Sequence, residues 1–157
     1  MNYKPIIILS GEPYSVFLEI FFKTKKIKKF KRPLVLIVSK KLLYLQMKKL
    51  GFNFKLNIVN LKTNNLNTLN NKMINIIDVD FDFKNAFEKI SNSSNVYIEN
   101  CFKVALQLLK DKKCIGLING PISKKKFLKQ KFYGITEYLA FKTNNENKVA
   151  MLIYNKK

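Results

Sequence analysis

The residues best suited to chemistry lie between Cys114 and Glu137. The short apolar run from Cys114 to Ile118 predicts a buried strand, which the sequence Asn119-Gly120-Pro121 must end in a tight turn. Ser123 is a suitable N-cap for a basic helix over 124–130. Free backbone N–H groups and several ammonium groups would then lie just beyond the strand, an arrangement that suits an anionic ligand.

A second turn at Gly134 is followed by Thr136 and Glu137, which together are typical of another helix start. The Thr136 hydroxyl could face the same ligand crevice, or it could simply cap this helix, and its residue type leaves both open. Lys124 could pair with a phosphate of the ligand or with a carboxylate near the crevice, but surface lysines are common in this chain and a solvated lysine is the stronger explanation. Gly120 and Pro121 are expected to set the geometry of the first turn, and Gly134 that of the second.

Three further segments carry a family resemblance, together with the residues above. They are Pro5-Ile6-Ile7-Ile8 with Gly11-Glu12-Pro13 and Glu19 near the start, Gly134-Ile135-Thr136-Glu137-Tyr138-Leu139-Ala140, and Val149-Ala150-Met151-Leu152. In this order they resemble the 4-hydroxythreonine-4-phosphate dehydrogenase family of vitamin B6 biosynthesis, whose patterns are G-[ED]-P-A-G-I-G-P-E, T-G-P-[IV]-x-K, G-H-T-E and V-x-M-x-L. The likeness runs the length of this chain but covers about the N-terminal half of the family's length.

The resemblance implies NAD-dependent, metal-assisted oxidation of 4-phosphooxy-L-threonine, a phosphorylated hydroxy amino acid, on the route to pyridoxine 5′-phosphate. It implies a homodimer, and substrate binding by Thr136. The family's G-H-T-E histidine is replaced by Ile135, so a substrate contact there is lost or moved to a neighbour. The glycine-rich first loop carries Tyr14, Ser15, Phe17 and Leu18 instead, which makes close backbone approach to a ligand doubtful.

Histidine is absent from the sequence, whereas the family holds its divalent metal ion with three histidines that lie beyond the end of this chain. We therefore assign no metal ligand and no catalytic residue, and neither the NAD site nor the metal site is complete here. We expect a truncated N-terminal portion of the enzyme, inactive and poorly soluble by itself. Neither common nucleotide-binding glycine motif occurs, so the NAD assignment comes from the resemblance alone.

The net charge is +20, since 30 Lys and Arg oppose 10 Asp and Glu. Such a charge suggests a nucleic acid or an anionic membrane as partner, but Arg32 is the only arginine and the lysines are spread along the chain. A solvated basic surface is therefore the preferred interpretation, and nucleic acid an unlikely partner. The alternatives to the enzyme are a basic nucleic-acid- or anionic-surface-binding module and a catalytically dead partner subunit.

Alternating strand and helix patterns predict one α/β domain over 1–157, with a largely parallel sheet and flanking helices. The family resemblance implies that this domain is the first part of an isocitrate-dehydrogenase-like two-domain fold. Strands are predicted over 6–9, 34–38, 54–59, 73–79, 114–118 and 149–154, helices over 14–25, 40–50, 93–110 and 136–141, and a long loop over 60–72.

Three other features of the sequence have plain explanations. Asp78, Asp80 and Asp82 are interpreted as a solvated turn in preference to a cation site, because the glycine and distal glutamate of a calcium loop are missing. Cys101 and Cys114 are expected to be reduced core thiols. No apolar run is long enough to span a bilayer and no signal peptide is apparent, so a cytoplasmic protein is expected.

Overall fold

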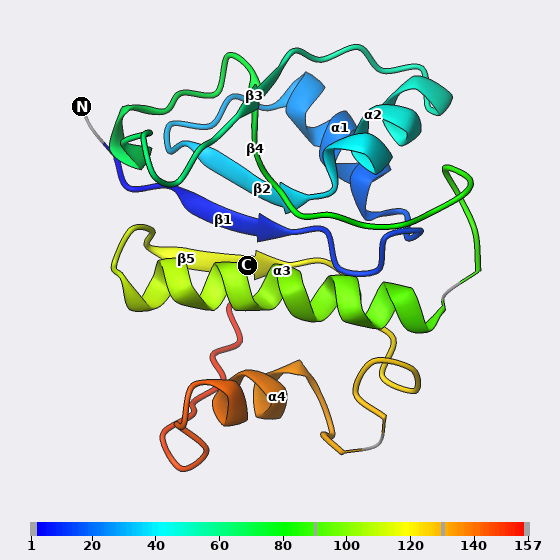
Figure 1. Ribbon diagram of the computed structural model, residues 1–157. Helices are drawn as coiled ribbons and strands as arrows, with labels where there is room; N and C mark the ends of the chain where they lie inside the picture. Colours follow the sequence, from blue (N-terminus) through cyan, green and yellow to red (C-terminus); the bar gives the residue numbers. More distant parts are fainter. Residues whose placement is uncertain (1–2, 90, 130, 156–157) are drawn as a thin grey trace. The chain divides into compact units, whose positions relative to one another are not determined.

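The computed structural model describes residues 3–89, 91–129 and 131–155. The chain divides into two compact units, with the boundary between Pro121 and Ile122. The first unit contains a five-stranded sheet in the order β3-β4-β2-β1-β5. Its strands are β1 (Ile6–Leu9), β2 (Leu34–Val38), β3 (Leu56–Ile58), β4 (Ile74–Asp78) and β5 (Gly116–Asn119), and every pair of neighbours is parallel (Figure 1).

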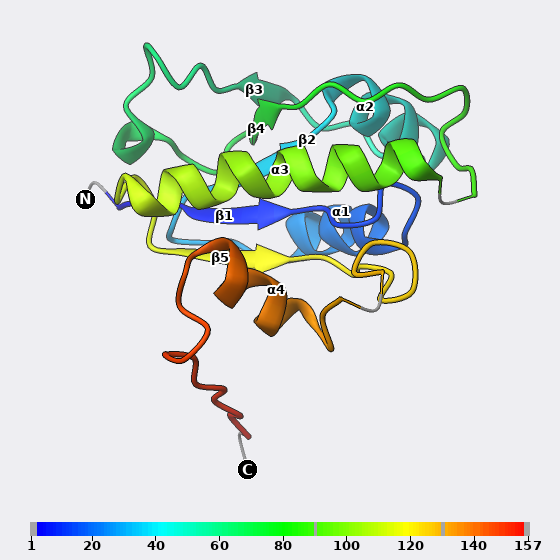
Figure 2. The same cartoon turned by 60° about the horizontal axis from the view of Figure 1, so that its bottom comes forward.

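Helices cover both faces of this sheet, which explains why its central strands are continuous apolar runs. Helix α3 (Asn92–Lys110) lies across one face, and α1 (Phe17–Ile27) and α2 (Lys40–Lys49) lie on the other (Figures 1 and 2). The predicted α/β class with a parallel sheet and flanking helices is therefore confirmed.

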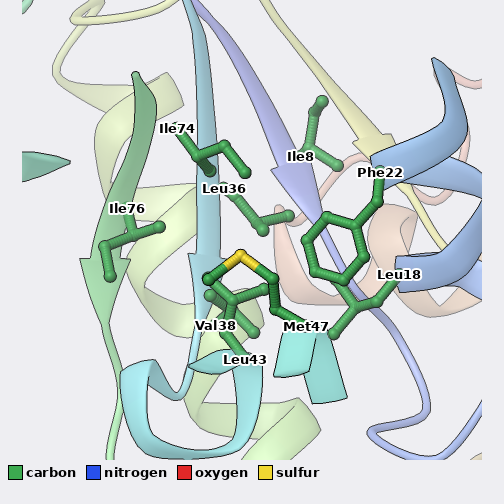
Figure 3. Packing of buried hydrophobic residues seen from close by; sticks show 9 residues of the cluster. All are labelled: Ile8, Leu18, Phe22, Leu36, Val38, Leu43, Met47, Ile74 and Ile76. Carbon is green, nitrogen blue, oxygen red and sulfur yellow. The ribbon is translucent and has the colours of Figure 1, made fainter. Parts of the chain in front are cut away.

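The core between the sheet and α1 and α2 is built from alternate residues of each strand. Phe22 of α1 and Met47 of α2 meet Ile8, Leu36 and Ile76 there, and all five side chains are at most 5% exposed (Figure 3). Phe22 also contacts the rings of Phe52 and Phe54, with centroids 5.3 and 6.0 Å away. Because Phe54 packs against Phe22 in this way, the residues just before β3 are not part of the sheet. The observed strand is therefore shorter than the strand predicted over 54–59.

Serine side chains cap the N-termini of two of the helices. Ser39 accepts a hydrogen bond from the Leu42 N–H at 3.4 Å at the start of α2, and Ser91 forms a capping box with Ser94 at the start of α3. Helix α1 begins three residues later than predicted, because the chain after Pro13 first makes a turn in which the Ser15 N–H donates to the Glu12 carbonyl at 3.1 Å.

The long loop predicted over 60–72 is present, with one short 3₁₀ turn at Leu66–Thr68. Leu66 anchors it with 6% exposure. Asn75 of β4, 2% exposed, donates to the carbonyls of Leu34 and Asn70 at 3.0 and 2.8 Å and accepts from Asn57 at 2.9 Å. A buried amide that is fully hydrogen-bonded in this way fixes the end of the loop against the sheet.

The second unit contains α4 (Ile135–Lys142) and an aromatic cluster. Tyr138 meets Phe127 and Phe132 at centroid distances of 5.2 and 5.6 Å. The strand predicted over 149–154 is wrong, because these residues form no strand and Leu152 is 94% exposed. A strand needs a neighbour to take its backbone hydrogen bonds, and no strand occurs among the described residues of this unit.

Both cysteines are free and buried, as predicted for core thiols. Burial raises the pKa of the Cys101 thiol to about 12, and it raises that of Cys114 as well. None of the helices that the structure describes combines the length and the apolar character needed to cross a membrane.

Candidate functional site

Two loops at the carboxyl edge of the sheet pack backbone against backbone in the first unit. The Gly120 N–H donates to the Leu9 carbonyl and the Glu12 N–H donates to the Pro121 carbonyl, both at 2.8 Å. Gly11 has a φ of +70°, and a Cβ added to it would lie 2.3 Å from the Pro121 oxygen. A Cβ added to Gly120 would lie equally close, at 2.3 Å, to the Ser10 oxygen.

Protein backbone therefore occupies the space beside Gly11 and Gly120, so these glycines do not form an open cradle for a ligand. Asn119 supports the turn by donating to the Gly120 carbonyl at 3.2 Å. This arrangement agrees with the expectation that Gly120 and Pro121 set turn geometry. It also shows why a glycine is needed in the first loop, which the sequence pattern alone did not explain.

Glu12 is a candidate that the residue-by-residue reading of the sequence passed over. Its side chain is 5% exposed and follows β1 at the edge where parallel sheets usually bind ligands. The sequence does place Glu12 directly after an apolar strand, which could have marked it as a candidate. Burying a carboxylate there costs free energy unless surrounding groups stabilise its charge.

Tyr14 takes the place of a small residue in the same loop. Its hydroxyl donates to the Glu88 carboxylate at 3.4 Å. Burial, and then the nearby Glu88 charge, raise the pKa of Tyr14 to about 12. Tyr14 therefore keeps its proton at neutral pH and serves as a hydrogen-bond donor, not as a base.

The basic helix predicted over 124–130 is wrong for the described residues 124–129, which form only turns. Ser123 does cap one turn, since its carbonyl accepts from the Phe127 N–H at 2.9 Å and its hydroxyl from the Lys126 N–H at 3.2 Å. Lys125 and Lys129 would lie one turn apart on a helix, where like charges repel, and Lys129 has a φ of +48°, which interrupts a helix. Gln130 lies outside the described residues.

Thr136 lies in the first turn of α4, but it is not the cap. Gly134 occupies the N-cap position. Of the two roles predicted for Thr136, helix capping is therefore excluded. Glu137 lies in the same turn, where a carboxylate interacts favourably with the helix dipole. Ile135, at the position of the family histidine, is half-buried as the first helical residue.

Thr136 lines a cavity of about 480 Å³ within the second unit, a volume typical of small-molecule sites. Two carboxylates, Glu137 and Glu146, share this cavity with an apolar wall of Phe132, Ala140, Phe141, Val149 and Met151. Neither Lys124 nor Ile135 lines it. A hydroxyl and two carboxylates in an apolar hollow suit the donor or cationic part of a ligand, so the pairing of Lys124 with an anionic group stays a prediction.

The described residues do not fit a bound divalent metal. No three His, Cys, Asp or Glu side chains among them are grouped so as to hold an ion. Asp78 instead accepts a hydrogen bond from the Lys40 N–H at 2.7 Å, and Asp80 and Asp82 are exposed. The loops at Gly11 and Gly120 offer no open phosphate cradle either, because protein backbone occupies the space beside both glycines.

Comparison with known proteins agrees with the fold. The structure superposes on 4-hydroxythreonine-4-phosphate dehydrogenases from Salmonella typhimurium and Klebsiella pneumoniae, each with a TM-score of 0.74. The sequence identities are 22% and 18%, and each match covers 90% of this chain and 45% of the other. The corresponding protein from Burkholderia phymatum gives a TM-score of 0.71 at 20% identity.

The sequence itself is 32% identical over 156 residues to the 4-hydroxythreonine-4-phosphate dehydrogenase of Sulfurihydrogenibium sp. (strain YO3AOP1). That match covers 97% of this chain and 46% of the relative, so the chain spans a little under half the length of the relative. The family model described as "Pyridoxal phosphate biosynthetic protein PdxA" matches residues 29–157. Because that match takes in most of the sequence, the chain belongs to the PdxA family.

Proposed function

We propose that this chain is the N-terminal part of a 4-hydroxythreonine-4-phosphate dehydrogenase that oxidises 4-phosphooxy-L-threonine in pyridoxine 5′-phosphate biosynthesis. The match of the PdxA family model to residues 29–157 carries the proposal. By the same membership we propose a cytoplasmic homodimer that uses NAD and a divalent metal ion. We also propose that the two compact units belong to one domain over 1–157, which is one part of a longer two-domain enzyme.

The chain's own contribution is substrate binding. The Thr136 hydroxyl can both donate and accept a hydrogen bond, and its place in the cavity of the second unit supports contact with the polar groups of the substrate. The neighbouring Glu137 and Glu146 carboxylates can accept hydrogen bonds from the ammonium group of the substrate. Oxidation of the alcohol also requires a hydride acceptor and a group that polarises the hydroxyl, and we assign neither to this chain.

The test joins this chain to the remaining C-terminal part of the Sulfurihydrogenibium relative and measures NAD reduction with 4-phosphooxy-L-threonine. We expect turnover by the joined protein and none by the 157-residue chain, which has no histidine. Thr136→Val should lower kcat/KM by about two- to tenfold, the value of one hydrogen bond. Ile135→His should raise it by restoring a donor that isoleucine lacks.

Thr63→Val is the matched control, because Thr63 is an exposed residue of the 60–72 loop. It should leave kcat/KM unchanged. If the joined protein is folded but fails to reduce NAD, both with Ile135 and with histidine in its place, the proposed activity is overturned. Equal losses in the Thr136 and Thr63 variants would remove Thr136 from the binding site.

A further inference from the structure

Cations gather at one edge of the sheet in the first unit. The five strands are parallel, so their starts lie along the same edge, which we call the amino edge (Figure 1). Every strand is preceded within four residues by lysine or arginine: Lys4 before β1, Lys31 and Arg32 before β2, Lys55 before β3, Lys72 before β4, and Lys112 and Lys113 before β5. The parallel topology therefore brings these lysines and Arg32 together along the amino edge, and we call this row of cations the basic rim.

Carboxylates gather at the opposite edge. Asp78 ends β4, Asp80 and Asp82 follow it, and Glu12 follows β1. At the amino edge the nearest carboxylate in sequence is Asp111, which accepts from Gln107 at 2.7 Å and lies 4.0 Å from Lys113. Lysines occur at both edges, so a chain-wide excess of lysine accounts for the net charge but not for the scarcity of carboxylates at the amino edge.

A hollow of about 370 Å³ lies in the rim, lined by Lys25, Lys28, Lys29, Phe30, Asn71 and Lys72. Its frame is fixed by Asn71, whose amide donates to the carbonyls of Phe30 and Arg32 at 2.9 and 2.6 Å and whose oxygen accepts from the Leu34 N–H at 3.0 Å. The Lys25 ammonium donates to the carbonyls of Asn71 and Met73. Two lysine-bearing segments distant in sequence are thus held together around a space lined by no carboxylate.

A second hollow, of about 260 Å³, lies on the same edge. Lys4, Lys112 and Lys113 line it together with three asparagines, Asn64, Asn65 and Asn67, and with Leu61 and Leu66. The ammonium groups suit phosphates, and asparagine side chains both donate and accept hydrogen bonds, as the edges of nucleic-acid bases require. An extended polyanion could therefore follow the edge from one hollow to the other.

Aromatic side chains stand among these cations. Phe30 is 37% exposed where it lines the first hollow, and the Arg32 guanidinium lies 5.0 Å from the centre of the Tyr3 ring. Cationic grooves with aromatic faces are the usual means of holding single-stranded nucleic acid, with phosphates on the lysines and bases stacked on the rings. We propose that the amino edge binds single-stranded nucleic acid, with a base on Phe30 and phosphates on Lys28, Lys29 and Lys72.

The test measures fluorescence anisotropy of a labelled oligouridine with the whole chain, across a series of salt concentrations. The triple variant Lys28→Gln, Lys29→Gln, Lys72→Gln should bind about tenfold or more weakly, and the salt slope should fall by about 2, since each phosphate contributes about 0.7. The matched control, Lys40→Gln, Lys41→Gln, Lys84→Gln, removes the same charge from exposed lysines that follow β2 and β4, and should retain most of the affinity. Lys25 is left unchanged, because it holds the frame of the hollow.

Phe30→Ala tests the base contact separately, because it leaves the charge unchanged. It should weaken oligouridine binding about fivefold or more and leave polyphosphate binding unaltered. Equal losses in the two triple variants would overturn the proposal, because binding would then follow net charge alone. Polyphosphate that competes as well as oligouridine at equal charge, or binding to anionic phospholipid vesicles without binding to oligouridine, would overturn it too. Melting curves of every variant confirm that the exposed substitutions leave the fold intact.

Discussion

Replacing Gly120 by alanine should destabilise the first unit strongly, because the new methyl group has no space. Its Cβ would lie 2.3 Å from the Ser10 oxygen and 3.0 Å from the Phe17 ring, so the two loops must separate. Separation strains or breaks the bonds from Gly120 to Leu9 and from Glu12 to Pro121, both at 2.8 Å. Overpacking costs about 1–3 kcal/mol, and each weakened hydrogen bond adds about 0.5–1.5 kcal/mol. We expect the free energy of unfolding to fall by about 2–6 kcal/mol.

Gly116→Ala is the matched control, because it adds the same methyl group to β5, the strand that Gly120 follows, at a position where no atom beyond its chain neighbours lies within 4 Å of the new Cβ. It should change the free energy of unfolding by less than about 1 kcal/mol. Urea unfolding followed by circular dichroism measures both. In thermal unfolding the Tm of Gly120→Ala should fall by about 4–24 °C, at roughly 2–4 °C per kcal/mol. Equal unfolding midpoints for the two variants would refute the close approach of the two loops.

Three other predictions concern the packing of the same unit. Phe22→Ala removes a ring that is 0% exposed and should cost about 3–5 kcal/mol in urea unfolding, whereas Phe87→Ala, at a 45% exposed position of the same unit, should cost much less. Ser39→Ala removes the cap of α2 and should cost about 0.5–2 kcal/mol, while Thr63→Ala, which removes an exposed hydroxyl from the 60–72 loop, tests whether loss of a hydroxyl alone has this effect. Because folding raises the Cys101 pKa from 9.0 to about 12, it favours the protonated thiol, so its stabilising contribution is complete below about pH 9 and is lost as the pH rises towards about 12. Urea midpoints measured from about pH 7 to about pH 10 should decline less in Cys101→Ala than in the unaltered chain.

The sheet could be predicted from the sequence because burial on both faces leaves a plain signal. Leu34 to Val38 is apolar throughout, and the observed strand has those same limits. The residues 149–154 carry a similar signal, yet they form no strand. Apolar β-branched composition reports that a segment suits a sheet, but a strand exists only where a neighbouring strand accepts its hydrogen bonds. The first condition is local and visible in sequence, whereas the second is not.

The candidate site was harder to predict, since its details depend on contacts between distant residues. The pattern around Thr136 predicted a helix start correctly, but which residue caps it depends on backbone geometry, and Gly134 takes that place. Gly11 and Gly120 are more than 100 residues apart in sequence, and only the pairing of β1 with β5 shows that each makes room for the other's loop. The turns after Ser123 likewise escaped prediction, because the positive φ of Lys129 that interrupts a helix there is not visible in the residue types.

Parallel topology also explains how net charge can conceal a local arrangement. A charge of +20 summed over the chain suggests a uniform basic surface, and the even spacing of lysines along the sequence agrees with that view. In a parallel sheet, however, residues that recur before each strand meet at one edge and residues that recur after each strand meet at the other. No aspartate or glutamate occurs between Glu19 and Asp78, a range that includes the approaches to β2, β3 and β4. Spacing that looks uniform in sequence therefore becomes a charge separation across the fold, and binding measurements that compare the two edges at equal net charge distinguish a basic surface from a basic composition.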